Sequence, residues 1–265
     1  MKKTYIGLTC LLLLALALFV ALSFYGDSLE RWHIKTGSFA RVLIGDTTHR
    51  QRTPSSATAS TRAVSQAPGQ DFSQTVDTAR KSILFIGDSM LEGLGPRLAA
   101  YAEENGHTLV NVIWYSSTTE VWGRTEKLKE YIAEYQPDYI FVSLGGNELF
   151  VSNIRDRRQK YLDNMLSQIG DIPFVWIGPP NWKPDTGINE MLAETLRPGQ
   201  FYLSYTPDQY YDRARDGAHP TRASASAWMD RVCAWVMKSA AHRIVLHRPK
   251  AARATCHTVV LAPAK

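Results

Sequence analysis

The sequence predicts an α/β domain built on a parallel five-stranded sheet that helices cover on both faces. Short apolar runs alternate with segments whose apolar residues recur at helical spacing, from residue 83 to about residue 242. This alternation implies parallel pairing, because each helix carries the chain back to the start of the next strand. The composition, with 45% hydrophobic and 21% charged residues, is ordinary for a globular domain.

Breaker and capping residues place the elements in order. The first apolar run stops at Gly87, Pro137 ends the helix before the third strand, and Thr221 is a good N-cap for the final helix. These signals predict strands over 83–86, 107–114, 139–144, 174–177 and 200–204. They predict helices over 93–105, 125–135, 154–169, 188–196 and from 221 to about 242.

The N-terminal residues 1–26 are predicted to be a transmembrane anchor. Residues 4–26 carry no charge, and this stretch is long enough for a helix to cross a bilayer core of about 30 Å. Lys2 and Lys3 precede this stretch, so the positive-inside tendency places a single-pass protein in the inner (cytoplasmic) membrane with its domain on the extracytoplasmic side. The alternative is a signal peptide that is cleaved near residue 23.

Three further regions follow the anchor. Residues 27–73 form a membrane-proximal segment and then a flexible linker, because Ser, Thr, Gln, Ala and Pro dominate its second half and offer little apolar surface to bury. Residues 74–246 hold the α/β domain, and residues 247–265 are read as a basic tail. Cys233 and Cys256 either pair in an oxidising compartment or remain free, and the sequence favours neither.

The charge distribution argues against a nucleic-acid partner. The whole chain has a net charge of +5, but residues 71–241 hold 17 Lys and Arg against 22 Asp and Glu, a net charge of −5. A nucleic-acid-binding domain usually carries its basic patch on the folded part. The histidines lack the spacing of metal ligands, so we expect no metal and no other cofactor.

Three segments at or near predicted strand ends carry the groups of a nucleophilic site. They are Gly87-Asp88-Ser89, Gly146-Asn147-Glu148 and Asp216-Gly217-Ala218-His219. Because the carboxyl ends of parallel strands gather at one edge, the segments can converge. A serine hydroxyl needs an adjacent base, so Ser89 is the expected nucleophile and His219 its base, with Asp216 orienting the ring. The backbone N–H of Ser89 and the amide of Asn147 are expected oxyanion donors.

These motifs resemble those of the SGNH hydrolases, also called the GDSL-like family. The resemblance covers about residues 83–242 and implies a flavodoxin-like three-layer α/β/α sandwich. It also implies that Ser89, Asp216 and His219 are catalytic and that Asn147 donates to the oxyanion. Ser89 is not set in Gly-x-Ser-x-Gly, which argues against the α/β-hydrolase arrangement.

Two departures from the family pattern stand out. The second family block offers a glycine N–H as a third oxyanion donor, but residues 115–119 contain no glycine, so we place this donor at Ser117. The third block normally ends in Asp, whereas Glu148 follows Asn147 here, and we expect a positional role that tolerates the longer acid. Trp176 and Trp182 are candidates for lining a substrate pocket, with core or rim packing as the alternative.

The expected function is a membrane-anchored serine esterase that removes O-acyl groups, O-acetyl above all, from an envelope glycan or a related small ester. The location and the family resemblance suggest this substrate. An O-acyltransferase of periplasmic or cell-surface glycans would use the same site, with an integral-membrane acyl donor as a partner. A non-catalytic glycan-binding module is a third interpretation, which would predict the loss of a site residue; Ser89, Asn147 and His219 are all present.

Overall fold

A six-stranded parallel sheet forms the centre of the fold in the computed structural model, which describes residues 75–262. The strand order is β5-β4-β3-β1-β2-β6. The strands are β1 (Ser82–Gly87), β2 (Thr108–Trp114), β3 (Tyr139–Ser143), β4 (Phe174–Ile177), β5 (Phe201–Tyr202) and β6 (His257–Leu261). The α/β class and the parallel sheet are therefore confirmed, and the expected number of five strands is wrong.

The extra strand, β6, lies in the stretch that was read as a basic tail. It pairs with β2 in parallel, with Val110 opposite His257 and Trp114 opposite Leu261. The segment before β6 crosses α4, where the backbone N–H of Ala254 donates to the carbonyl of Pro96 at 2.9 Å. Arg253 reaches the carbonyl of Glu92, which has no α-helical donor because residue 96 is a proline.

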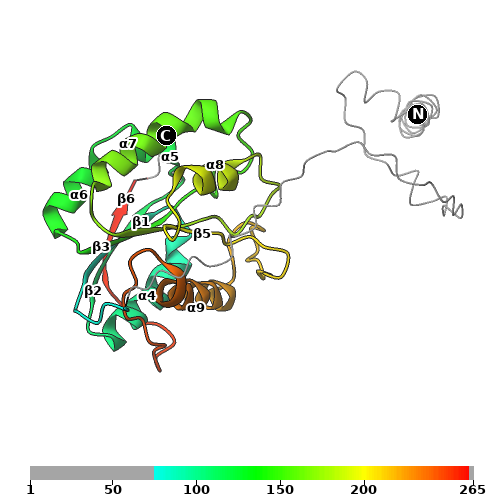
Figure 1. Cartoon of the computed structure of the whole chain (residues 1–265). Coiled ribbons are helices and arrows are strands. Elements are labelled where there is room, and N and C mark those ends of the chain that lie inside the picture. Colours follow the sequence, from blue (N-terminus) through cyan, green and yellow to red (C-terminus); the bar gives the residue numbers. More distant parts are fainter. Residues whose placement is uncertain (1–74, 263–265) are drawn as a thin grey trace, which may run out of the picture. The chain divides into compact units, whose positions relative to one another are not determined.

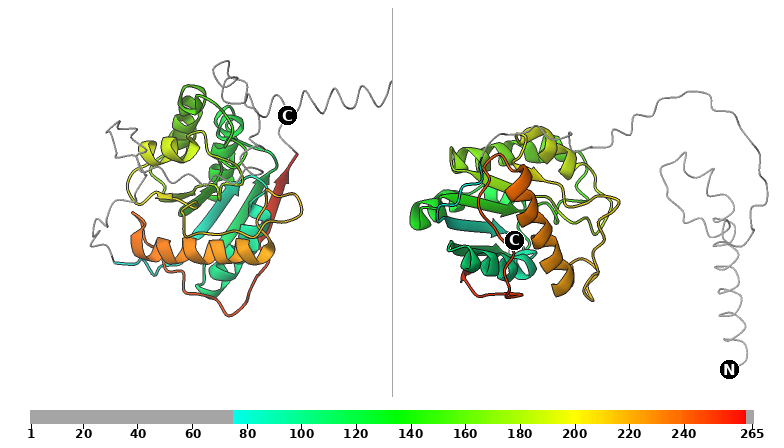
Figure 2. Two further views of the ribbon diagram at one scale, coloured as in Figure 1. Left: turned by 90° about the vertical axis from the view of Figure 1, so that its right-hand side faces the viewer. Right: turned by 60° about the horizontal axis from the view of Figure 1, so that its bottom comes forward.

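Helices cover both faces of the sheet, which gives the three layers (Figure 1). The helices are α4 (Leu91–Glu104), α5 (Thr119–Gly123), α6 (Lys127–Tyr135), α7 (Ile154–Ile169), α8 (Ile188–Thr195) and α9 (Arg222–Ser239). Helices α4 and α9 pack on one face, and α5 to α8 cover the other, as the turned views also show (Figure 2). The short helix α5 was not predicted, and α4 begins two residues before the predicted start.

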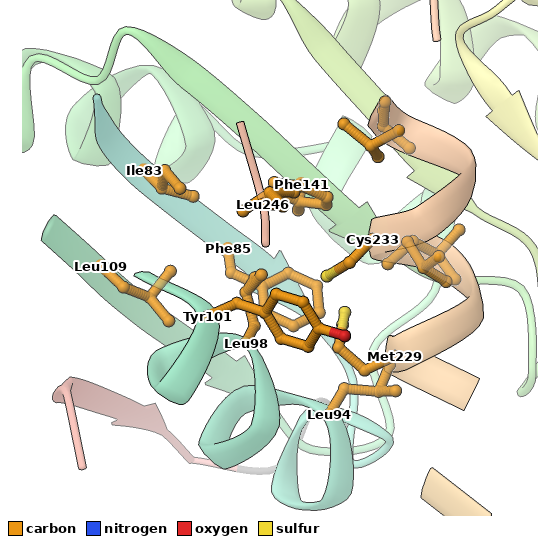
Figure 3. Packing of buried hydrophobic residues seen from close by; sticks show 14 of the residues in the cluster. Ile83, Phe85, Leu94, Leu98, Tyr101, Leu109, Phe141, Met229, Cys233 and Leu246 are labelled. Atoms are coloured by element: carbon orange, nitrogen blue, oxygen red, sulfur yellow. The ribbon is translucent and has the colours of Figure 1, made fainter. Parts of the chain in front are cut away.

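Two apolar cores fill the space between the layers because alternate strand residues face opposite sides of the sheet. Ile83 and Phe85 of β1 face α4 and α9, and Leu84 and Ile86 face the other layer. Figure 3 shows the first core, in which Phe85 and Phe141 meet edge to face with their centroids 6.0 Å apart. Strand β3 is buried along its whole length, as expected for a central parallel strand.

The strand order also fixes where a ligand site can form. Strand β1 lies between β2 and β3, so the chain reverses its direction of winding there, and the order β2-β1-β3-β4-β5 is the flavodoxin-like one. Open sheets of this kind bind ligands at the carboxyl ends of the strands beside this switch point. The loops after β1 and β3 are therefore the expected position of a site.

The predicted anchor and linker, residues 1–26 and 27–73, lie outside the described residues. Within residues 75–262 no helix is both long enough and apolar enough to span a bilayer. Cys233 is a buried residue of α9 and Cys256 is half-buried before β6; both are free thiols, so the structure has no disulfide between them.

Candidate active site

The loops after β1 and β3 bring Ser89 and Asn147 to the switch point of the sheet. Gly87 makes this approach possible, because a Cβ at this position would lie 2.3 Å from the carbonyl oxygen of Ser143 on β3. The backbone N–H of Asp88 then donates to that same carbonyl at 3.3 Å. Any larger residue at position 87 would push apart the two strand ends that carry the site.

Ser89, His219 and Asp216 form one continuous hydrogen-bonded chain. The hydroxyl oxygen of Ser89 lies 2.7 Å from Nε2 of His219, and Nδ1 of the same ring lies 2.7 Å from Oδ2 of Asp216. Ser89 and His219 are partly buried, whereas Asp216 is exposed. The base therefore contacts both the hydroxyl and the carboxylate, which is the geometry that nucleophilic catalysis requires.

The loop that carries His219 is held by its own short contacts. The carboxylate of Asp216 accepts hydrogen bonds from the backbone N–H of His219 at 3.0 Å and of Ala218 at 2.9 Å. The backbone and ring bonds from His219, followed by the bond from Ala218, lower the pKa of Asp216 to about 2. Asp216 is therefore a carboxylate throughout the neutral range and keeps the Nδ1 proton of His219 in place.

Arg213 fastens this loop to the one that follows β4. Its guanidinium donates to the carbonyl of Ala218 at 2.8 Å, to that of Asn181 at 3.1 Å and to that of Pro180. Every one of these acceptors is a backbone carbonyl. Sequence reasoning missed Arg213, because a guanidinium that binds carbonyls across two loops leaves no local pattern.

Asn147 lies beside Ser89 with its side-chain amide directed at two acceptors. Its Nδ2 donates to the carbonyl of Ser117 at 3.0 Å and, more weakly, to the carboxylate of Asp88 at 3.4 Å. The amide is thus placed next to the turn that carries Asp88 and Ser89. The longer of the two bonds is the one that an oxyanion could replace at little cost.

Ser117 is not available as the predicted third oxyanion donor. Its backbone N–H donates to the carbonyl of Trp114 at 3.1 Å, and its hydroxyl accepts from the indole of Trp122 at 3.0 Å. The residue is fully buried, and its carbonyl orients Asn147. The correction has a clear physical reason: the turn after β2 uses the Ser117 N–H to close itself, so Ser117 positions another donor.

Glu148 is the centre of a buried charge network beneath Asn147. Its carboxylate accepts from the backbone N–H of Thr119 at 2.9 Å, from the Thr119 hydroxyl at 2.7 Å and from Nε of Arg158 at 2.8 Å. Arg158 also pairs with Glu120 at 2.6 Å. Burial raises the pKa of Glu148, while Thr119 and Arg158 oppose that rise. The network joins the loops after β2 and β3, so it holds the Asn147 loop in register.

Asp88 is a buried carboxyl next to the proposed nucleophile. Burial raises its pKa to about 7, although the backbone N–H of Met90 donates to it at 2.9 Å. The native state thus binds this proton more tightly than the unfolded chain does. The resulting stability is fully present below the unfolded pKa and is lost as pH rises through about 7.

We expect Asp88→Asn to gain stability relative to wild type as the pH rises. Each unit between the folded and unfolded pKa values of Asp88 corresponds to about 1.4 kcal/mol, so the difference in unfolding free energy should move by a few kcal/mol between about pH 5 and about pH 8. Urea unfolding of both proteins followed by tryptophan fluorescence measures it. The exposed Asp171→Asn is the control and should show no such trend. A constant difference between wild type and Asp88→Asn would contradict the raised pKa.

The two tryptophans proposed for a substrate pocket differ in burial. Trp176 is completely buried in the core under α7 and α8, so its prediction as a substrate-binding residue is wrong. The alternation of strand β4 directs its side chain into the core, where its indole N–H donates to the carbonyl of Leu144 at 3.4 Å. Trp182 is partly exposed, and its indole N–H donates to the carbonyl of Gly146 at 2.9 Å, next to Asn147.

A cavity of about 460 Å³ lies elsewhere, where the segment before β6 crosses α4 and β2. It is lined by Leu91, Ile113 and Cys256 among others, and no residue of the Ser89 chain lines it. Within residues 75–262 no group of His, Cys, Asp or Glu side chains is arranged to hold a metal ion.

Comparisons with known proteins were made against families, curated proteins and solved structures. No family model and no curated protein matches this chain. The psychrotrophic esterase EstA from Pseudoalteromonas, in a structure inhibited by monoethylphosphonate, is 16% identical, with a TM-score of 0.41 over 57% of this chain and 93% of EstA. TesA is 19% identical, with a TM-score of 0.41 over 57% of this chain and 95% of its own.

A third solved structure is a lipolytic protein of the G-D-S-L family from Desulfitobacterium hafniense. It is 14% identical, with a TM-score of 0.38 over 57% of this chain and 97% of that protein.

Proposed function

We propose that this chain is a serine esterase of the SGNH type with Ser89 as its nucleophile. One observation carries the proposal: an unbroken hydrogen-bonded chain runs from the Ser89 hydroxyl through both ring nitrogens of His219 to Asp216, with 2.7 Å at each step. A nucleophile, its base and the group that orients the base are thus in contact without a bound substrate.

The proposed reaction begins with attack of the Ser89 oxygen on the ester carbonyl carbon, while Nε2 of His219 accepts the hydroxyl proton. The carbonyl oxygen becomes an oxyanion that the backbone N–H of Ser89 and the amide of Asn147 can stabilise. His219 then gives the proton to the departing alkoxide, which leaves as an alcohol. The acyl group stays on Ser89 as an acyl-serine. Water, activated by the same ring, then releases the acid and restores Ser89.

We propose an O-acyl group, O-acetyl above all, on an envelope glycan as the natural substrate. The support is the predicted export of the domain past an N-terminal anchor, together with a site that lies on the surface of the domain: Asp216 is exposed and His219 only partly covered. Such a site suits an ester that is attached to a polymer. With a membrane-bound acyl donor and a sugar acceptor, the same acyl-serine would pass its acyl group to the sugar in place of water.

The test is hydrolysis of p-nitrophenyl acetate by the purified full-length chain, followed by mass spectrometry of the protein after treatment with a phosphonate ester. We expect acetate release and a phosphonate adduct on Ser89 alone. Absence of both would exclude a serine esterase. Adding an oligosaccharide acceptor distinguishes hydrolysis from transfer. If acetylated sugar forms faster than acetate, the protein is a transferase and not a hydrolase.

A further inference from the structure

An exposed pair of aromatic rings lies beside the candidate active site. Phe150, three residues after Asn147, has 57% of its surface exposed, which is unusual for a phenylalanine in a folded domain. Its ring meets Trp182 edge to face, with the centroids 6.4 Å apart. The two rings come from the loops after β3 and β4, so they are part of the same end of the sheet as Ser89.

Two sets of hydrogen bonds connect this pair to the catalytic groups. On one side the Trp182 indole donates to the carbonyl of Gly146 at 2.9 Å, next to Asn147. On the other side Arg213 links Asn181, which precedes Trp182, to Ala218, which precedes His219. The aromatic pair is thus held directly between the loop of the oxyanion donor and the loop of the base.

Lys183 places a positive charge on this aromatic pair. Its ammonium nitrogen lies 4.7 Å from the centroid of the Trp182 ring and 5.6 Å from that of Phe150. In the part of the chain that the structure describes, Lys183 makes no ion pair with an acidic side chain, unlike Lys81, Lys127 and Lys129. Its charge therefore remains available to an anionic ligand, and the exposed position keeps it accessible.

We propose that Phe150, Trp182 and Lys183 form a subsite for a sugar ring that carries a carboxylate, as in a uronic acid. The apolar face of a sugar ring packs on aromatic rings, and the ammonium of Lys183 pairs with the carboxylate at the ring's edge. This inference rests on the proposed function and narrows its substrate to an acylated acidic glycan.

The position of Lys183 favours this chemistry over a neutral sugar. The described domain, residues 75–262, has 21 Lys and Arg and 21 Asp and Glu, so its net charge neither attracts nor repels an anionic polymer as a whole. At this rim Lys183 brings a positive charge that no acidic side chain pairs with in the part of the chain that the structure describes, whereas the carboxylate of Asp216 acts on the charge of Arg213. A local cation next to the aromatic pair selects where and in which orientation an anionic chain can approach.

The experiment measures equilibrium binding of a galacturonic acid trisaccharide and of its carboxyl-reduced, neutral counterpart to the full-length chain. We expect the wild type to bind the charged trisaccharide more tightly, with a difference that shrinks at high salt. Lys183→Met should weaken binding of the charged sugar by about fivefold, the order expected for one exposed ion pair, and should leave the neutral sugar unaffected. Lys183→Arg should retain the preference.

Lys160→Met is the matched control, because Lys160 also lies over an aromatic ring, 4.8 Å from the centroid of Tyr161, but on helix α7. It should leave the binding of both sugars unchanged. Equal affinity of the wild type for the two trisaccharides, no binding of either at millimolar concentration, or equal loss in Lys183→Met and Lys160→Met would each overturn the subsite. Hydrolysis of p-nitrophenyl acetate is measured separately, so a failure of the esterase proposal is distinguishable from a failure of this one.

Discussion

Ser89→Ala is expected to remove ester hydrolysis almost completely while the domain remains folded. The hydroxyl of Ser89 is the group that hydrogen-bonds to His219, so its loss removes the bond-forming atom and should lower kcat by several orders of magnitude. The effect on stability should be small, because the substitution deletes a single partly buried hydrogen bond to a partly exposed ring.

The measurement compares kcat/KM for p-nitrophenyl acetate and the thermal unfolding midpoint of wild type, Ser89→Ala and Ser167→Ala. Ser167 is an exposed serine of helix α7 and serves as the matched control, for which no change is expected. If Ser89→Ala retains more than about a tenth of the wild-type rate, the nucleophile is a residue other than Ser89. Loss of activity together with a collapsed unfolding midpoint would instead show a structural defect.

Local sequence patterns predicted much of the fold because its strands are short buried runs with clear stops. Helix α7 and strand β4 have the predicted bounds, Ile154–Ile169 and Phe174–Ile177. The expectation that Ser89 and Asn147 approach each other follows from the same pattern, since both come directly after parallel strands whose carboxyl ends share one edge. The catalytic roles of these residues remain predictions for the variants to test.

Strand β6 escaped the sequence analysis because its signal is not local. The strand has five residues and pairs with β2, well over a hundred residues earlier in the chain. Its segment begins with basic and polar residues, its apolar run is only Val259 to Leu261, and three of the five strand residues are exposed, so the local signal is weak. Its pairing depends on the unfilled edge of β2, which only the assembled sheet provides.

The corrected site residues show a second limit of sequence reasoning: a local pattern does not reveal in which direction a hydrogen bond or a side chain points. Ser117 has the right place in the chain, but its N–H closes the turn after β2 and its carbonyl orients Asn147. Trp176 lies in a strand near the site, but faces the core. The role of Arg158 was equally hidden, because a buried arginine on a helix looks the same in sequence as an exposed one.

His219→Ala is expected to lower kcat by nearly as much as Ser89→Ala, because the Ser89 hydroxyl then has no base. The groups of such a chain act as a unit, so the double variant Ser89→Ala/His219→Ala should be no slower than the worse single variant. Asp216→Asn should cost less than either, since Asp216 is exposed and solvent can partly replace its contact with the ring. If the loss of rate in the double variant equals the product of the two single losses, Ser89 and His219 do not act in one reaction step. The esterase site would then have to be sought elsewhere.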